Sequence, residues 1–239
     1  MGFLRAMRID VPPERLPEGY LARVAAVRHL TRQELRFPTP VTVLSGENGA
    51  GKSTLIEAIA LGMRFQHQGG TRNLYTDKRN DVSRLHEVLI LTRERNPRHG
   101  YFLRGETHFN VALAYGAEEP PGDIHLNHMS HGESLMQVIL HRFHPGGFYL
   151  LDEPEAGLSA LRQVELLGRI AHLAARGAQF IIATHSPILM AAPGATILEL
   201  NNAGITPIDF DHAGAVSATR EFLDDPEGTA HYLVETDHA

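Results

Sequence analysis

The stretch Gly46-Glu47-Asn48-Gly49-Ala50-Gly51-Lys52-Ser53 governs the interpretation of the whole chain. It matches the pattern G-x-x-x-x-G-K-[ST], whose glycines let the backbone turn its N–H groups inward around phosphate oxygens. The apolar run Val41–Leu44 precedes it, and apolar residues at helical spacing follow it, namely Leu55, Ile56, Ile59 and Met63. A strand, a glycine-rich loop and a helix in this order predict a phosphate site at the helix N-terminus.

The loop assigns a role to several of its residues. Lys52 would reach the β- and γ-phosphates, Ser53 would ligate magnesium, and Thr54 would support an α-phosphate contact. Lysine is scarce in this chain, because Lys52 and Lys78 stand against twenty arginines. A chance glycine-rich turn is the alternative interpretation. The expected nucleotide contacts are Gly46, Glu47, Asn48, Gly49, Ala50, Gly51, Lys52, Ser53 and Thr54.

A second signal is the stretch FYLLDEPE, residues 148–155. Four apolar residues predict a strand buried on both faces of a parallel sheet, and ligands bind at the carboxyl edge of such sheets. Asp152 is expected to hold magnesium, directly or through water, and Glu153 to orient or deprotonate the attacking water. A buried strand that ends in a solvated acidic turn is the alternative.

Two further signals follow the same logic. The segment Thr184–Pro187 comes directly after the apolar strand Phe180–Ala183, and its His185 is expected to sense the γ-phosphate or orient the water; a surface histidine is the alternative. Ser130 and Gly132 open a helix that is expected over residues 133–143, and free N–H groups there would bind a phosphate. For this second signal, an ordinary N-cap is the alternative.

Alternating buried strands and helices predict an α/β fold with a mainly parallel sheet. We expect one domain over residues 1–239, with a small helical lobe inserted at about 105–146. Short strands are expected over residues 3–9 and 20–30, two strands joined by a turn over 88–91 and 101–103, a helix over 158–175, a hairpin over 197–200 and 205–208, and a final helix over 216–223.

Composition narrows the functional classes. The formal net charge of -6 and the pI of about 6.2 argue against a whole-surface grip on nucleic acid or an anionic membrane. The absence of cysteine excludes disulfides and cysteine-bound metals. No apolar run reaches the roughly 18 residues of a membrane span, and no signal-peptide core is present. These features predict a soluble cytoplasmic protein.

Weaker patterns leave alternatives open. His125, His128 and His131 recur at a spacing of three, which permits a metal site, although solvated histidines near a nucleotide are the simpler interpretation. Arginines surround Tyr101 and Phe102, and a basic, aromatic hairpin there would contact nucleic acid, whereas the alternative is a solvated turn. The arginines are Arg93, Arg95, Arg98 and Arg104. No guanine-selecting N-K-x-D motif is present, which favours ATP over GTP.

The glycine-rich loop, the Ser130 helix, the Asp152 strand and His185 follow one another in this order, with about 22 residues from Ser130 to Asp152. This combination resembles the ATP-binding cassette (ABC) superfamily. It looks most like the stand-alone P-loop heads of SMC and DNA-repair ATPases, which are often labelled AAA-family or ABC-type ATPases. The resemblance covers roughly residues 35–200. It implies an ABC-type head of the P-loop NTPase fold, with ATP and Mg2+ as cofactors and ATP hydrolysis as the activity.

The resemblance also implies a dimer. Ser130 and Gly132 would be the signature that contacts the γ-phosphate held by a second subunit, Glu153 the catalytic carboxylate and His185 the switch histidine. Residues 155–159 would form the loop that crosses the interface. ATP would then be sandwiched between two heads, so an ATP-dependent homodimer is expected, and hydrolysis would release it.

Departures from the family pattern bear on the choice of function. His131 replaces the first glycine of the signature, Glu133 stands where transporters often have glutamine, and Ser159 replaces an aspartate; no clear Q-loop glutamine is present. The favoured function is a soluble ATPase coupled to a DNA-repair-like or defence-like process, with a nucleic acid or a soluble protein as partner. The ATP-binding subunit of a membrane transporter and a non-hydrolysing nucleotide switch are the alternatives, and the carboxylate of Glu153 argues against the switch.

Overall fold

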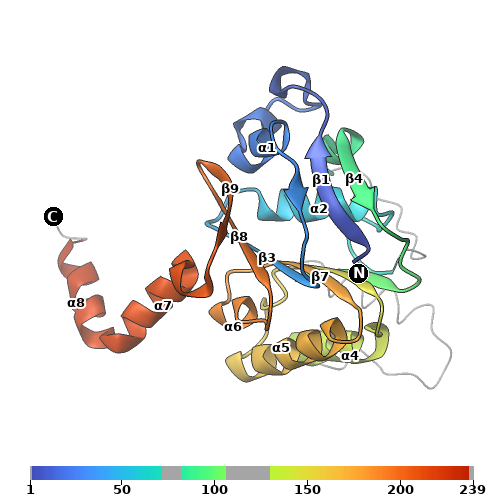
Figure 1. The fold of residues 1–239 in the computed structure, drawn as a ribbon. Coiled ribbons are helices and arrows are strands. Elements are labelled where there is room, and N and C mark those ends of the chain that lie inside the picture. Colours follow the sequence, from blue (N-terminus) through green and yellow to red (C-terminus); the bar gives the residue numbers. More distant parts are fainter. Residues whose placement is uncertain (1, 72–81, 106–129, 237–239) are drawn as a thin grey trace.

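The computed structural model describes residues 2–71, 82–105 and 130–236 (Figure 1). Its centre is a six-stranded sheet in the order β5-β6-β7-β3-β8-β9. Every neighbouring pair is parallel except the β8–β9 hairpin. The strands are β3 (Val41–Ser45), β5 (Gly100–Arg104), β6 (Phe148–Asp152), β7 (Gln179–Ala183), β8 (Thr196–Asn201) and β9 (Gly204–Ile208). The predicted α/β fold with a mainly parallel sheet is confirmed, as is the hairpin.

A smaller antiparallel sheet covers one side of the molecule, with β1 (Leu4–Ile9) between β2 (Leu35–Arg36) and β4 (Leu89–Arg93). Helix α2 (Lys52–Gly62) contacts β6 and β7 of the large sheet and β4 of the small one. The predicted apolar face of α2 is buried, and so are Ala58 and Ala60 on its other sides. Apolar residues on several sides of a helix are what packing between two sheets requires.

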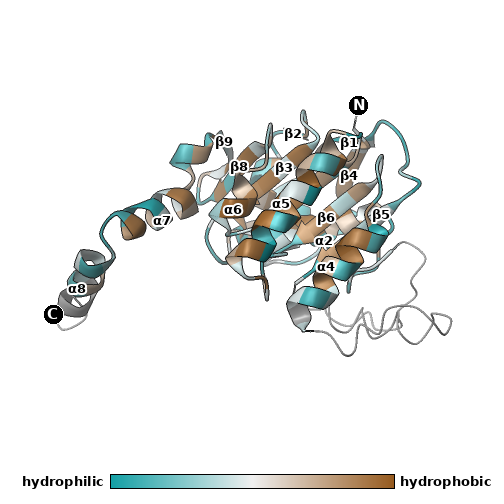
Figure 2. Cartoon of the chain, turned by 90° about the horizontal axis from the view of Figure 1, so that it is seen from below, coloured by the Kyte–Doolittle hydropathy of each residue, from teal (hydrophilic) through white to brown (hydrophobic). Residues whose placement is uncertain are grey.

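Helices α4 (His131–Arg142), α5 (Ala160–Ala174) and α6 (Pro187–Met190) cover the opposite face of the large sheet (Figure 2). Their apolar sides meet a cluster of buried rings in which Phe143 stacks on Tyr149 with centroids 4.2 Å apart and Phe180 lies 5.0 Å from Tyr149. Both α4 and α5 lie within two residues of their predicted bounds. With both faces covered, the central strands β3, β6 and β7 are buried along their whole length, and most of their residues are apolar.

The predicted strand over residues 20–30 is wrong. The chain forms a short 3-10 turn, η2 (Leu21–Arg23), and helix α1 (Ala25–Leu30). Ala26, Val27 and Leu30 are buried, and this spacing puts them on one side of a helix, against β1 and β9. The apolar residues of this segment therefore form the buried side of a helix, and not the buried face of a strand.

The predicted basic hairpin around Tyr101 is also wrong. Strands β4 and β5 both exist, but β4 pairs with β1 in the small sheet and β5 pairs with β6 in the large one. Tyr101 and Phe102 are 1% and 0% exposed, because they point into the two cores on opposite faces of the sheet. Their rings are not available to stack on nucleic-acid bases.

The C-terminal part contains two helices, α7 (Gly214–Asp224) and α8 (Pro226–Thr236), which extend away from the sheets (Figure 1). The final helix predicted over residues 216–223 corresponds to α7, and α8 was not predicted. The remaining short elements are the 3-10 turns η1 (Pro13–Arg15), η3 (Arg84–Glu87) and η5 (Phe210–His212). Within the described ranges, no helix is long and apolar enough to cross a membrane.

The lobe expected at 105–146 falls largely on residues 106–129, which lie outside the described residues. Helix α4 is its described part, and it packs beside α5. The lobe and its bounds stay a prediction.

A buried amide side chain forms hydrogen bonds between the two sheets. Gln179, at the start of β7, accepts hydrogen bonds from the backbone N–H groups of Phe3 (2.6 Å) and Leu4 (2.9 Å), and donates one to the Leu4 carbonyl (2.8 Å). Gln179 is 1% exposed. Buried backbone groups need partners, so this amide holds the N-terminal strand against the large sheet.

Gln179→Leu should therefore destabilise the fold by about 2–4 kcal/mol, because it leaves three buried backbone groups without their partner. Urea unfolding followed by circular dichroism measures this change. The control is Gln137→Leu on α4, where the side chain forms a hydrogen bond with the exposed side chain of His141, and about 0.5 kcal/mol or less is expected. Equal effects of the two variants would contradict the role given to Gln179.

Candidate functional site

The register of the parallel strands places four segments in one row. Arg104 on β5 aligns with Asp152 on β6, Asp152 aligns with Ala183 on β7, and Ala183 aligns with Leu44 on β3. All four strands therefore end at the same edge of the sheet. The residues that follow them, including the glycine-rich loop, Glu153 and His185, start from that edge, which is where ligands bind in such sheets.

The loop between β3 and α2 depends on its glycines. Gly46, Gly49 and Gly51 have positive φ angles of 133°, 80° and 99°, which side chains rarely tolerate. A Cβ atom on Gly46 would lie 2.2 Å from the Leu200 carbonyl oxygen, and one on Gly51 would lie 2.6 Å from a Val24 methyl group. The loop is therefore pressed against β8 and the segment before α1, and these two glycines cannot be replaced without shifting it.

Lys52 bridges the loop. Its Nζ donates hydrogen bonds to the carbonyls of Gly46 (2.7 Å) and Glu47 (3.1 Å), and the residue is 4% exposed. Burial lowers the pKa of Lys52, while the carboxylates of Glu153 and Asp152 oppose that shift. The ammonium group thus lies in a field of negative charge.

Helix α2 begins at Lys52, and no side chain among the described residues caps it. The first N–H groups of a helix have no partner within the helix, and they carry a positive partial charge. Ser53 and Thr54 in this first turn are partly exposed. The turn has the groups that an anion-binding site needs.

Asp152 ends β6 and is 5% exposed. Arg104 ends the neighbouring strand, and its Nε lies 3.6 Å from Asp152 Oδ2. The same guanidinium donates from Nη1 to Glu57 Oε2 at 2.7 Å and to the His67 carbonyl at 3.3 Å. Sequence reasoning missed Glu57 and placed Arg104 on a solvent-facing hairpin. The position of Arg104 at the end of a short apolar strand was the available signal.

Glu153 has a positive φ of 49°, which is uncommon for a residue other than glycine. Its N–H donates to the Ala183 carbonyl at 2.9 Å, and this bond helps to hold the backbone in place. The close approach of Gly105, whose Cβ would lie 2.4 Å from the Glu153 carbonyl oxygen, leaves no room for a side chain there. Such strained backbone is concentrated at functional sites.

His185 faces Glu153 across the same edge. His185 Nε2 lies 3.7 Å from Glu153 Oε1, and both side chains are about a third exposed (37%). The backbone N–H of His185 donates to Glu155 Oε1 at 2.7 Å. The sequence assigned Glu155 only to the interface loop, so its role in fixing His185 was missed.

Ser130 and Gly132 lie at a second location. Ser130 is the N-cap of α4, and it forms a capping box with Glu133, whose carboxylate accepts from Ser130 N (2.9 Å) and Oγ (2.7 Å). These bonds lower the pKa of Glu133. A Cβ on Gly132 would lie 2.8 Å from the Gly157 carbonyl oxygen, so α4 begins against the loop of residues 155–159.

The oxygen donors at the sheet edge fit a magnesium ion. Mg2+ keeps several waters and takes one or two protein ligands besides phosphate oxygens, and the Ser53 hydroxyl and the Asp152 carboxylate are donors of that kind. Within the described ranges, no three histidine, aspartate or glutamate side chains gather as a metal site on their own. His125 and His128 lie outside the described residues.

Two family models match parts of the chain. A model described as "AAA domain" matches residues 23–98, which contain the glycine-rich loop. A model described as "AAA domain, putative AbiEii toxin, Type IV TA system" matches residues 125–191, which contain Ser130, Asp152, Glu153 and His185. A search of the curated proteins finds no match.

Solved structures match most of the chain at low identity. An ABC transporter described as "putative metal-chelate type" in an inward-facing conformation is 15% identical, with a TM-score of 0.52, over 89% of this chain and 85% of that one. The SMC head domain from Thermotoga maritima is 18% identical, with a TM-score of 0.49, over 87% of this chain and all of that one (100%). An ATP-binding subunit of an ABC transporter is 20% identical, with a TM-score of 0.46, over 87% and 90%.

The sheet order, the glycine-rich loop between β3 and α2, and the match to the inward-facing transporter structure agree with one another. The chain has the P-loop NTPase fold that is found in ABC ATPase domains.

Proposed function

We propose that this protein binds ATP with Mg2+, hydrolyses it, and forms a homodimer on ATP. The observation that carries the proposal is the single sheet edge that joins Lys52, Asp152, Glu153 and His185. A phosphate-binding helix start, an oxygen donor for a cation, and a carboxylate paired with a histidine are the parts that phosphoryl transfer to water needs.

The charge at this edge explains why a divalent cation is needed. Glu153, Asp152, Glu47 and Glu155 all act electrostatically on Lys52. A triphosphate that enters beside these carboxylates meets like charges, which one lysine and the helix N-terminus do not balance. Mg2+ held by Ser53 and Asp152 would supply the missing positive charge and would polarise the phosphate oxygens.

The chain's own residues account for activation of water. Glu153 would accept the proton from the attacking water or orient it, because the carboxylate is partly exposed and its backbone is held to Ala183. His185, 3.7 Å away, would orient the same water or contact the γ-phosphate. Glu155 fixes His185 through its backbone N–H, so the distance between His185 and Glu153 is set from both sides.

The proposed dimer interface is the surface around the loop of residues 155–159. Ser130, Gly157 and Ser159 are exposed there, and Leu161 at the following turn is 79% exposed. A two-fold axis would bring Ser130 of each copy to the nucleotide of the other and complete two sites at once. Glu133 would then have to release Ser130 as the partner's phosphate approaches, because both anions compete for the same helix start.

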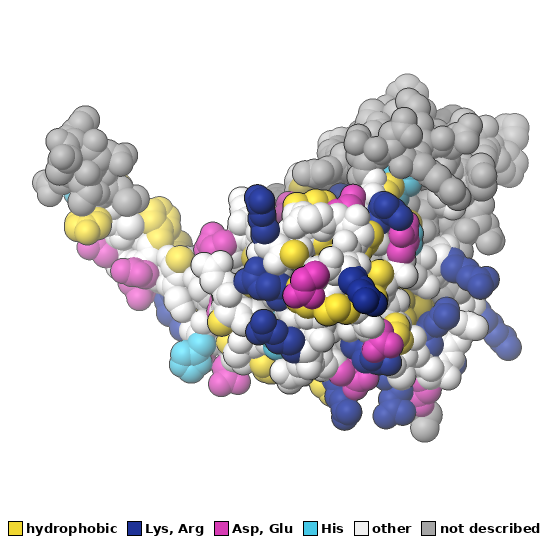
Figure 3. Space-filling model, turned by 90° about the horizontal axis from the view of Figure 1, so that it is seen from above, with side chains coloured by type: hydrophobic (Ala, Val, Ile, Leu, Met, Phe, Trp, Pro, Cys, Tyr) yellow, Lys and Arg dark blue, Asp and Glu magenta, His cyan; other side chains and the backbone are white. Residues whose placement is uncertain are grey.

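The process that ATP hydrolysis drives is proposed to be DNA-repair-like or defence-like. The description of the matched family model, which names a toxin of a type IV toxin–antitoxin system, supports the defence-like form. Seen from above, the molecule carries basic side chains mixed with carboxylates (Figure 3). The exposed pairs Arg36–Glu34 at β2 and Arg84–Glu87 on η3 have the same mixed character. This mixed charge favours a soluble protein partner over extended contact with a nucleic-acid backbone.

Lys52→Ala should weaken ATP binding by at least about tenfold, since a charge-assisted phosphate contact contributes about 1.5–3 kcal/mol. Isothermal titration calorimetry with Mg2+ present measures the affinity. Arg36→Ala, which removes an exposed cation on β2, is the control and should bind as the wild type does. Unchanged affinity in Lys52→Ala would refute the phosphate site.

Glu153→Gln should lower ATP turnover by about 10²-fold or more, because the amide keeps the shape but cannot accept the proton. Phosphate release measures turnover, and ATP binding should persist. His185→Ala should also be slow. The control is Glu165→Gln on the exposed side of α5, and wild-type turnover in Glu153→Gln would mean that another group activates the water.

Glu153→Gln protein should be a monomer without nucleotide and a dimer with Mg-ATP, because ATP forms part of the interface and this variant does not hydrolyse it. Light scattering measures the mass.

Ser130→Arg, added to this variant, should abolish the dimer and leave ATP binding to each monomer intact. Glu133→Gln should instead dimerise at lower ATP, since it removes an anion beside the partner's phosphate. A Glu153→Gln protein that stays monomeric at saturating ATP and high concentration would end the homodimer model.

A further inference from the structure

Among the residues that the structure describes at this sheet edge, Arg104 is a cation that the proposed phosphate contacts do not use. Its guanidinium lies between two carboxylates from different elements, Glu57 on α2 and Asp152 on β6. The side chains are 19%, 11% and 6% exposed for Arg104, Glu57 and Asp152. Ion pairs this far from solvent are weakly screened. The position of the guanidinium therefore determines how strongly its positive charge acts on each of the two carboxylates.

The two contacts of Arg104 are unequal. Nη1 donates to Glu57 Oε2 at 2.7 Å, whereas Nε lies 3.6 Å from Asp152 Oδ2, beyond hydrogen-bond length. Within the part of the chain that the structure describes, Nε is buried and makes no hydrogen bond. The guanidinium is therefore held mainly by Glu57, and it lies close to Asp152 without forming a hydrogen bond to it.

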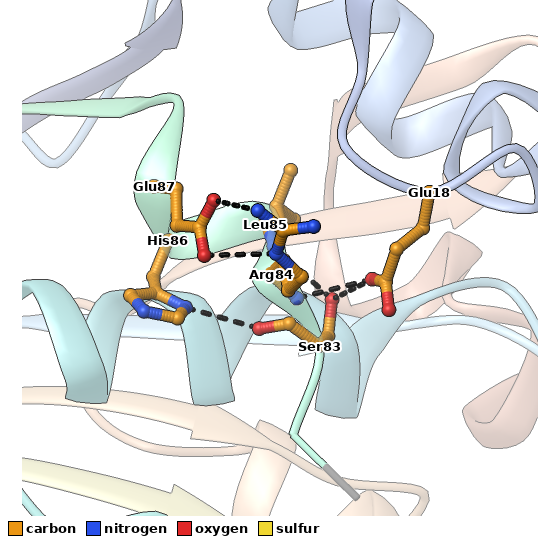
Figure 4. Close-up of polar contacts among 6 residues, drawn as sticks. All are labelled: Glu18, Ser83, Arg84, Leu85, His86 and Glu87. Carbon is orange, nitrogen blue, oxygen red and sulfur yellow. Dashed lines mark hydrogen bonds and ion pairs between the residues drawn. The ribbon is translucent and has the colours of Figure 1, made fainter.

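Glu57 is itself fixed from a second direction. Its Oε1 accepts from the Ser83 backbone N–H at 3.1 Å. Ser83 is anchored by Glu18 and by the η3 turn that it caps (Figure 4). The His67 carbonyl accepts a further bond from Arg104 Nη1 at 3.3 Å. These contacts set how far the guanidinium can move toward Asp152.

We propose that Arg104 is a positioning residue that occupies the place of a cation beside Asp152, and that Glu57 holds it back so that Mg2+ can bind there. The inference rests on the proposed function, in which Asp152 is a magnesium ligand. Arg104 offsets part of the negative charge of the Asp152 carboxylate before the metal arrives. It also weakens the attraction of Asp152 for the metal, because like charges repel at this distance.

This balance predicts opposite effects for the two partners. Glu57→Gln removes the nearer anion, so Arg104 shifts toward Asp152 and competes better with Mg2+. Arg104→Gln removes the competing cation, so the metal meets two carboxylates. If Arg104 and Glu57 had a merely structural role, both substitutions would disturb the site, and both would raise the Mg2+ concentration that nucleotide binding requires.

The experiment measures retention of a non-hydrolysable ATP analogue at fixed concentration while MgCl2 is titrated. Relative to the wild type, the Mg2+ concentration at half-retention should rise about three- to tenfold in Glu57→Gln and fall about three- to tenfold in Arg104→Gln, as expected for one charge at short range. Arg104→Gln should also gain thermal stabilisation from MgCl2 without nucleotide. Arg104→Lys, which keeps the charge, should lie within about twofold of the wild type.

The exposed pair Arg36–Glu34 at β2 is the matched control. Arg36→Gln and Glu34→Gln make the same changes outside the site and should leave the midpoint unchanged. Shifts in the same direction for Glu57→Gln and Arg104→Gln, or no shift in either, would overturn the role of Arg104. If Arg104→Gln does not fold, a Glu57→Gln midpoint at or below the wild-type value overturns it alone. A wild-type protein that retains no analogue at any Mg2+ concentration would refute the proposed function instead.

Discussion

The parallel register of β3, β7, β6 and β5 is the constraint on which the rest of the molecule depends. It brings Leu44, Ala183, Asp152 and Arg104 into one row, and each segment that follows inherits its place from this row. A slip of one residue in any strand would turn its side chains to the opposite face. Two apolar cores, one on each face of the sheet, make such a slip costly.

The same edge concentrates negative charge. Several carboxylates surround the single ammonium group of Lys52, and the guanidinium of Arg104 lies between the carboxylates of Glu57 and Asp152. Carboxylates held this close together favour a bound divalent cation, and the uncapped start of α2 favours a bound anion. A metal-bound triphosphate satisfies both preferences at once, which is the physical basis of the proposed activity.

Much of the site could be predicted because its signals are local. The glycine pattern before Lys52 and the apolar runs before Asp152 and His185 mark strand ends, and parallel strands place such ends together. What failed depends on pairing partners distant in the sequence. Tyr101 and Phe102 look like an exposed aromatic pair until β5 is placed beside β6, and residues 20–30 look extended until α1 packs on β9. Glu57 gave no signal, because only the fold brings it to Arg104.

The proposed activity requires that Mg-ATP binds at the carboxyl edge of the large sheet. A crystal structure of the Glu153→Gln protein with Mg2+ and ATP would test this binding directly. We expect phosphate oxygens on the N–H groups of the first turn of α2 and on Lys52 Nζ, with the metal between Ser53 and Asp152. A nucleotide bound elsewhere, or phosphates that do not contact Lys52, would contradict it.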